Sequence, residues 1–114
     1  MRWSVIILLA ALGASGCASR LSEAKTHVLE ARYPQALAQY RALRPELPRM
    51  SPAELFEYAL YRGLSHLALG DAQPASRWLT LAKRLSEQTP GVADAEARGQ
   101  LLSAWRSMGY MPGE

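Results

Sequence analysis

Apolar residues recur every three or four positions from Ser19 almost to the end of the chain, which is the spacing that gives an α-helix one buried face. Breaks that contain proline or glycine divide this pattern into five segments. Strong helix formers dominate the segments, and β-branched residues are few. The pattern predicts an all-α fold, with helices at about residues 19–31, 34–44, 51–69, 71–88 and 90–108.

The third segment carries the clearest signals for where a helix begins and ends. Ser51-Pro52-Ala53-Glu54 places serine at the N-cap, proline at the first helical position and glutamate at the third, which is the order of a capping box. Gly70 follows this segment, and Gly109 follows the last one, where a left-handed residue ends a helix. Thr89-Pro90 resembles another cap, so we expect the last helix to begin at Pro90.

The first two predicted helices align with the next two at a shift of 39 residues. Small residues match small residues and most large apolar residues match large ones, as stacked repeats require because each unit buries its apolar face against its neighbour. The aligned pairs are Leu21 with Leu60, Ala24 with Gly63, Val28 with Leu67, Ala31 with Gly70, Ala36 with Ala75, Tyr40 with Leu79, and Leu43 with Ala82.

The second of these units resembles a tetratricopeptide repeat (TPR). Gly63 stands at the small position of the first helix, with Leu67 one turn later, and Gly70-Asp71 makes the turn. In the second helix Ala75 takes the small position, and Leu79 and Ala82 follow it. The shift departs from the usual TPR length of about 34 residues. The surplus fits in the loop 44–51, and the proline that normally ends a unit is displaced to Pro90.

The resemblance implies two antiparallel helical hairpins plus a C-terminal capping helix, with a binding groove between the first helices of the units. A generic helical bundle is the alternative. Two and a half repeats are fewer than the three that such arrays normally need, so a partner or self-association would complete the array. The close packing of the repeat would rest on small residues, which are Ala24, Ala36, Gly63, Gly70, Ala75 and Ala82.

The N-terminal segment has a different pattern. Arg2 precedes an unbroken apolar or small run from Val5 to Ala14. This run of about ten residues is half of what a bilayer core requires and suits the apolar region of a signal peptide. Small residues then lead to Cys17, the single cysteine of the chain, which excludes an intrachain disulfide and a CxxC site.

Ala14-Ser15-Gly16-Cys17 resembles a bacterial lipobox, although Ala14 stands where leucine is usual. The resemblance implies a lipoprotein signal peptide over residues 1–16 and acyl chains such as palmitate on Cys17. The helical pattern then divides the rest of the chain into a short tether over 17–20, a helical domain over 21–109 and a flexible tail over 110–114. An ordinary signal peptide and a buried helix of a cytosolic protein are the alternatives. The residue after Cys17 is Ala18. In the resembled lipoproteins an aspartate at this position signals retention in the inner membrane, so Ala18 favours the outer membrane, facing the periplasm, over the inner membrane.

Charge and motifs exclude several classes of function. The 114 residues suffice for one domain, and the net charge of +3 is scattered among acids without a basic run, so we expect no nucleic-acid binding. No Ser/His/Asp order, phosphate loop or HExxH motif occurs, so we expect neither an enzyme nor a cofactor. His27 and His66 align across the repeat, and no further ligands converge on them in sequence, so no metal site is predicted.

The aromatic and basic residues of the third segment are the candidates for partner binding, because Tyr and Arg are enriched at interface hot spots. They are Tyr58, Tyr61, Arg62 and His66, whereas Trp78 and Trp105 are expected to anchor the core. The predicted function is a membrane-anchored interaction module or assembly adaptor of the bacterial cell envelope. A structural envelope lipoprotein without a groove, and a small enzyme or ligand carrier, are the alternatives.

Replacement of Cys17 by alanine tests the lipid anchor. Metabolic labelling with a fatty acid is expected to mark the wild-type chain and to leave Cys17→Ala unlabelled, because the thiol is the nucleophile that takes the lipid. Labelling that survives the substitution would disprove lipidation at Cys17.

Overall fold

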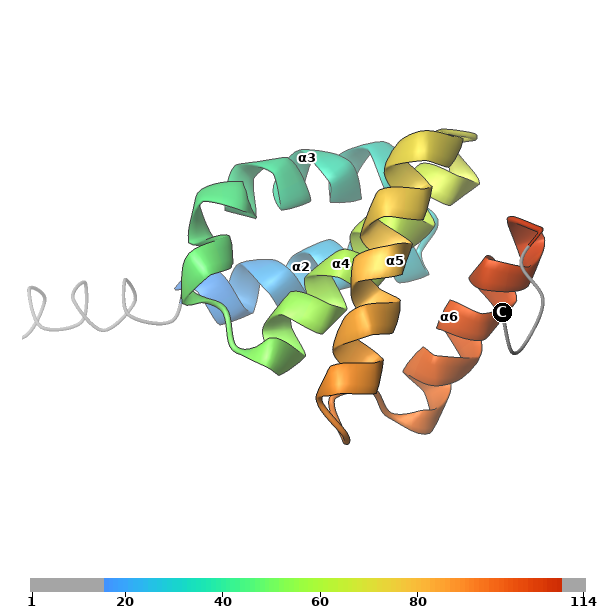
Figure 1. The fold of residues 1–114 in the computed structure, drawn as a ribbon. Coiled ribbons are helices and arrows are strands. Elements are labelled where there is room, and N and C mark those ends of the chain that lie inside the picture. Colours follow the sequence, from blue (N-terminus) through green and yellow to red (C-terminus); the bar gives the residue numbers. More distant parts are fainter. Residues whose placement is uncertain (1–15, 110–114) are drawn as a thin grey trace, which may run out of the picture.

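The computed structural model describes residues 16–109, and this part of the chain contains five α-helices and no strand. The prediction of an all-α fold is therefore confirmed (Figure 1). The predicted signal peptide through Ser15, with two of the lipobox residues, and the predicted tail 110–114 lie outside the described residues. The helices are α2 (Gly16–Leu29), α3 (Tyr33–Leu43), α4 (Pro52–Ala68), α5 (Ala72–Gln88) and α6 (Ala95–Ser107), and a 3₁₀-helix, η1 (Arg44–Arg49), follows α3.

The capping box at the start of α4 forms as its sequence predicts. The backbone N–H of Glu54 donates to Ser51 Oγ over 3.2 Å, and the backbone N–H of Ser51 donates to Glu54 Oε1 over 3.0 Å. Pro52 occupies the first turn, where its missing N–H leaves no bond unmade. Gly70 and Gly109 end α4 and α6 with φ of +80° and +94°, a conformation that glycine adopts without strain.

The start of α6 differs from the prediction. The helix begins at Ala95, and its N-cap is Asp94, whose carboxylate accepts from the backbone N–H of Ala97 over 2.8 Å. Gly91 has φ of +86°, which turns the chain away from a helical path directly after Pro90. The expected cap at Thr89 was therefore wrong, and residues between Pro90 and Asp94 form the connection between α5 and α6.

The first helix also begins and ends differently. Among the described residues α2 starts at Gly16, so it includes residues 17–20, which the sequence analysis assigned to a tether. Cys17 is half-buried and packs against the edge of the core. At the other end, Ala31 is exposed in the turn with φ of +60° and does not lie on the apolar face.

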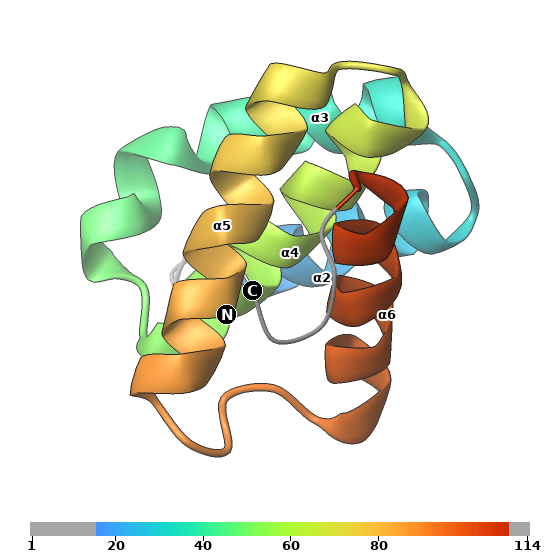
Figure 2. The same cartoon turned by 45° about the vertical axis from the view of Figure 1, so that its right-hand side comes forward.

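Helix α4 is the centre of the arrangement, because it contacts each of the other four α-helices. It pairs with α5 along its length, while α2 pairs with α3, and both α2 and α3 also touch α4. Figure 2 shows α4 between α5 and α6, with α2 and α3 beyond it. Helix α2 contacts α4, and α4 contacts α6, so the first, third and fifth helices pack one after another. Helix α6 also packs on α5.

The core contains more aromatic packing than the alanine-rich sequence suggests. Tyr40 and Tyr58 are fully buried, and their ring centroids lie 5.1 Å apart in an edge-to-face arrangement. Trp78 meets Tyr58 in the same way at 5.3 Å. Such contacts stabilise by about 1 kcal/mol each beyond the area they bury. The Tyr58 hydroxyl also donates to the backbone carbonyl of Tyr40 over 2.6 Å, which ties α4 to α3.

The turn after α2 and the turn after α4 have the same backbone hydrogen bonds at a shift of 39 residues. The N–H of Ala31 donates to the carbonyl of Val28, as that of Gly70 does to Leu67. The next residue donates five residues back in both turns, from Arg32 to His27 and from Asp71 to His66. Ala31 and Gly70 both have positive φ. The aligned sequences therefore form the same helix-ending turn twice.

Gly63 allows α4 and α5 to approach each other. A Cβ atom at this position would lie 2.7 Å from Leu79 Cγ and 3.2 Å from the backbone nitrogen of Leu79. The first distance is too short for a contact between non-bonded carbon atoms. The second involves a backbone nitrogen, which cannot move without its helix. The absence of a side chain at residue 63 therefore sets the separation of the two helices.

Gly63→Ala tests this close approach. We expect the free energy of unfolding in urea to fall by about 1–3 kcal/mol, because overpacking outweighs the better helix propensity of alanine. Gly99→Ala is the matched control, since Gly99 is also helical but has open space where its Cβ would lie. The free energy of unfolding of Gly99→Ala should rise by up to about 1 kcal/mol, because alanine has the better helix propensity. An equal gain in both variants would show that the contact with Leu79 does not limit the packing.

Candidate functional site

The four residues that the sequence singles out for partner binding all lie on α4, and none is exposed. Tyr58 is 0% exposed, Tyr61 5%, Arg62 7% and His66 4%. Because α4 is covered by helices on several sides, residues beside its apolar stripe are also enclosed. They point to two different sides of the helix, and each side borders a cavity.

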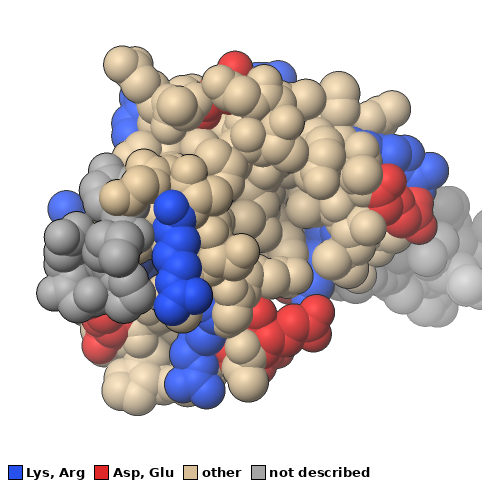
Figure 3. Space-filling model, turned by 90° about the vertical axis from the view of Figure 1, so that its right-hand side faces the viewer, with Lys and Arg blue, Asp and Glu red and all other residues tan. Residues whose placement is uncertain are grey.

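The larger cavity is a groove of about 700 Å³ between the end of α2, the second half of α4, and α6. Figure 3 shows the side of the molecule on which α6 lies, where most of the surface is uncharged. Tyr61 is the one candidate residue that lines this groove. Val28, Leu64 and Leu67 give it apolar walls, and Gln100, Ser103 and Ser107 of α6 supply polar groups.

The groove has little charge and one buried acceptor without a partner. Glu96 is the only charged residue among those that line it. The side-chain oxygen Oε1 of Gln100 is buried, and it has no hydrogen-bond partner within the described residues. Leu29 is 59% exposed at the rim. An apolar cavity with a few polar groups is typical of a binding site for an apolar segment.

Tyr61 is held in place from two helices. Lys25 of α2 places its ammonium group 5.2 Å from the centre of the Tyr61 ring, a cation–π contact, and also pairs with Glu57 at 3.8 Å. Ser65 donates to the backbone carbonyl of Tyr61 over 2.8 Å. Burial raises the pKa of Tyr61, so its phenol is neutral at pH 7.

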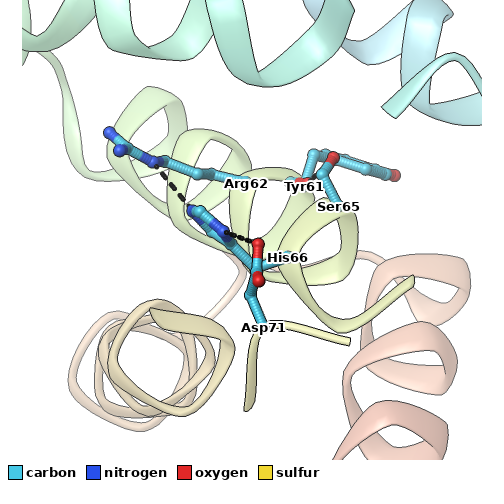
Figure 4. A network of polar contacts seen from close by, with 5 residues as sticks. All are labelled: Tyr61, Arg62, Ser65, His66 and Asp71. Atoms are coloured by element: carbon cyan, nitrogen blue, oxygen red, sulfur yellow. Dashed lines mark hydrogen bonds and ion pairs between the residues drawn. The ribbon is translucent and has the colours of Figure 1, made fainter. Parts of the chain in front are cut away.

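A second, smaller cavity of about 330 Å³ lies on the other side of α4, where α4 meets α5 and the end of α3. Arg62 and His66 line it, together with Arg44, Arg77, Trp78, Pro74 and Leu81. We call it the arginine pocket. Figure 4 shows that Arg62 and His66 leave α4 on one side, whereas Tyr61 and Ser65 leave it on another.

Arg62 has neutral partners only. Its Nη1 donates to the Tyr58 hydroxyl over 2.7 Å, and its Nε donates to His66 Nε2 over 3.5 Å. The guanidinium carbon lies 4.7 Å from the centre of the Trp78 ring. Within the described residues, Arg62 forms no ion pair. A buried cation without a counter-ion is unfavourable, so this arrangement needs an explanation.

These bonds define the state of His66. Because Nε2 accepts from Arg62, the ring proton is on Nδ1, which lies 3.5 Å from Asp71 Oδ2 (Figure 4). Burial lowers the pKa of His66, the hydrogen bond with Asp71 opposes this, and the charge of Arg62 lowers the pKa further. His66 is therefore neutral at pH 7 and adds no charge to the pocket.

Sequence reasoning did not find the other residues of the arginine pocket. Trp78 was expected in the core, but it is only partly buried and stacks on Arg62. Arg44 and Arg77 are exposed, and in sequence they are two among many scattered arginines. The available signal was the spacing of Tyr58, Arg62 and His66, which are four residues apart and form one polar stripe along α4.

Two other kinds of feature are absent from the described part of the chain. Between Gly16 and Gly109, no three His, Cys, Asp or Glu side chains come together as a metal site would require. No helix in this range is both long and apolar enough to cross a membrane.

Comparison with known proteins gives no further indication of function. No protein-family model matches the chain, and no significant similarity to a curated protein or to a solved structure is found.

The lowered pKa of His66 predicts a specific pH dependence of stability. Unfolding restores the usual pKa of 6.5, so below that pH the unfolded chain binds a proton that the folded chain does not. The free energy of unfolding should therefore fall as the pH drops from 7.5 towards 5.5. In the variant His66→Gln, glutamine can keep both hydrogen bonds without titrating. Its free energy of unfolding, measured in urea titrations, should therefore fall less over this pH range. Equal slopes would contradict the burial of a neutral histidine.

Proposed function

We propose that this chain is a small lipid-anchored protein of the bacterial cell envelope, and that its TPR-like domain binds a segment of a partner protein in the groove between α2, α4 and α6. The observation that carries the proposal is the position of the groove. A TPR-like array places its binding surface along the first helices of its units, and the 700 Å³ groove is lined by α2, α4 and α6, which hold those positions.

The geometry of the two turns supports the repeat. Hydrogen bonds of the same pattern end α2 and α4, at a shift of 39 residues. The small residues at the predicted crossing are enclosed, since Ala24, Ala36, Ala75 and Ala82 are each 0% exposed. Gly63 touches the backbone of α5 as a close helix crossing requires. Gly70, the remaining small residue, serves the turn and not the helix crossing.

The lining of the groove indicates the chemistry of the partner segment. Its walls are aliphatic and aromatic, so apolar side chains of the segment would bury surface there at about 25 cal/mol per Å². The unpartnered Gln100 Oε1 would accept from a main-chain N–H of the segment. Glu96 at the rim disfavours an acidic segment.

The anchor would complete the function. With an acylated Cys17 at the start of α2, the domain would lie directly on the membrane surface without a flexible linker. One acyl chain binds membranes only marginally, whereas two or more hold a protein stably. A domain held in this way would meet membrane-bound partners at a high local concentration, which is the advantage of an adaptor with a short groove.

Site-specific photocrosslinking in intact cells tests the groove. A photoreactive phenylalanine at Ser103 or at Leu64, which line the groove from α6 and α4, should capture the same protein from both positions. The same residue at Arg84, exposed on α5 outside every cavity that borders α4, should capture it at least tenfold less. Melting curves of the three variants check that each is folded.

Two results would contradict the proposal. Capture of the same proteins from Arg84 and from the groove positions would show that proximity at the membrane, not the groove, selects the neighbours. Capture of no protein from either groove position would favour a structural envelope protein without a dedicated groove.

A further inference from the structure

The arginine pocket is separate from the groove and poses a problem of charge. Three arginines, Arg44, Arg62 and Arg77, are among the residues that line one cavity of about 330 Å³. A guanidinium group is positively charged at neutral pH. Within residues 16–109 none of the three forms an ion pair with a carboxylate.

The acidic group that His66 contacts, Asp71, does not compensate this charge. Asp71 is bonded to His66, on the side of the imidazole ring away from Arg62, and its side chain is 51% exposed. It does not line the pocket. His66 is neutral, and Arg41 of α3 adds a further positive charge whose effect reaches His66. The pocket is therefore a concentration of positive charge with low-dielectric walls, which attracts anions.

Arg62 is held in an orientation suited to binding. The Trp78 ring lies 4.7 Å from its guanidinium carbon, and the bonds to Tyr58 and His66 occupy Nη1 and Nε. The remaining nitrogen, Nη2, donates to no group within the described residues. Arg62 as a whole is 7% exposed, and this nitrogen is not among the fully buried side-chain atoms, so the free donor is accessible from the cavity. A preorganised donor of this kind loses little entropy when a ligand binds.

From this geometry we infer that the arginine pocket binds a phosphate group. Arg62 would contribute the preorganised donor at its base, and the exposed side chains of Arg44 and Arg77 would close on the anion from the rim. Guanidinium groups bind phosphate through paired, charge-assisted N–H···O bonds. A phosphate dianion offers more acceptor atoms and more charge than a single carboxylate, which would leave most of the three positive charges uncompensated.

The source of the phosphate group is either a soluble phosphate or the headgroup of a phospholipid. Both present negatively charged, non-bridging phosphoryl oxygens to the pocket, a soluble phosphate as a dianion and a phospholipid diester as a monoanion. The inference does not depend on the groove or on its partner segment, and the experiment distinguishes the two sources.

The binding test uses the full chain in a neutral detergent, with equilibrium dialysis against radiolabelled inorganic phosphate at constant ionic strength. Saturable binding of one phosphate per chain is the expected result. Arg44→Ala and Arg77→Ala should each weaken it at least fivefold, and since both side chains are exposed, the fold should survive their removal. Arg106→Ala is the control, because it removes the same charge from an exposed position on α6 and should change binding less than twofold.

Competition then identifies the source. Displacement of the label by dihexanoylphosphatidylglycerol, a short-chain phospholipid used below its micellar concentration, indicates a lipid headgroup. Displacement by unlabelled phosphate alone indicates a soluble phosphate. Three results would overturn the inference: no saturable binding, an equal loss in Arg106→Ala, and equal displacement by sodium acetate. The last would show that the pocket attracts any anion.

Discussion

The contact between Gly63 and Leu79 is the constraint on which the rest of the structure depends. It brings the backbones of α4 and α5 close enough for side chains on either side of the contact to interlock. On one side Trp78 reaches Arg62 and Tyr58, and Tyr58 in turn reaches the carbonyl of Tyr40 on α3. If the two helices were farther apart, this chain of contacts from α5 to α3 would open. The arginine pocket would then lose the tryptophan that forms its wall.

Helix α4 separates two environments of opposite character. One side of it borders a groove with tyrosine and aliphatic walls and a single charged residue, and the other side borders a pocket lined by arginines. Residues adjacent in sequence serve the two sides, since Tyr61 lines the groove and Arg62 lines the pocket. This division follows from helical geometry, because consecutive side chains are about 100° apart around the axis. A helix covered on several sides can therefore supply two unrelated sites.

Local signals in the sequence identify most helix boundaries but not how completely each helix is covered. The capping box at Ser51 and the turn at Gly70 depend on a few adjacent residues, so the sequence contains what is needed to predict them. Thr89-Pro90 shows where local reasoning fails. It has the form of a cap, but Gly91 turns the chain, and Asp94 caps the helix instead.

The polar residues of α4 were beyond local reasoning for a different reason. Arg62 and His66 have the composition of a surface stripe, and only the packing of α5 and the end of α3 over that stripe encloses them. Trp78 was expected inside and Arg62 outside, yet the two side chains stack on each other at the border of the core. Periodicity gives the direction of a side chain around its own helix, but it does not give the neighbouring element on that side.

The connection between α3 and α4 has a consequence for the kinetics of the proposed binding. The surplus residues of the first unit form η1, a 3₁₀-helix with one proline in its first turn and Pro48 in its interior. Proline fixes φ, so this segment acts as a stiff spacer and not as a hinge. The angle between the two helix pairs is then set before any ligand arrives. A surface with a preset curvature associates without waiting for a rearrangement, so differences in affinity among ligands would arise in their dissociation rates.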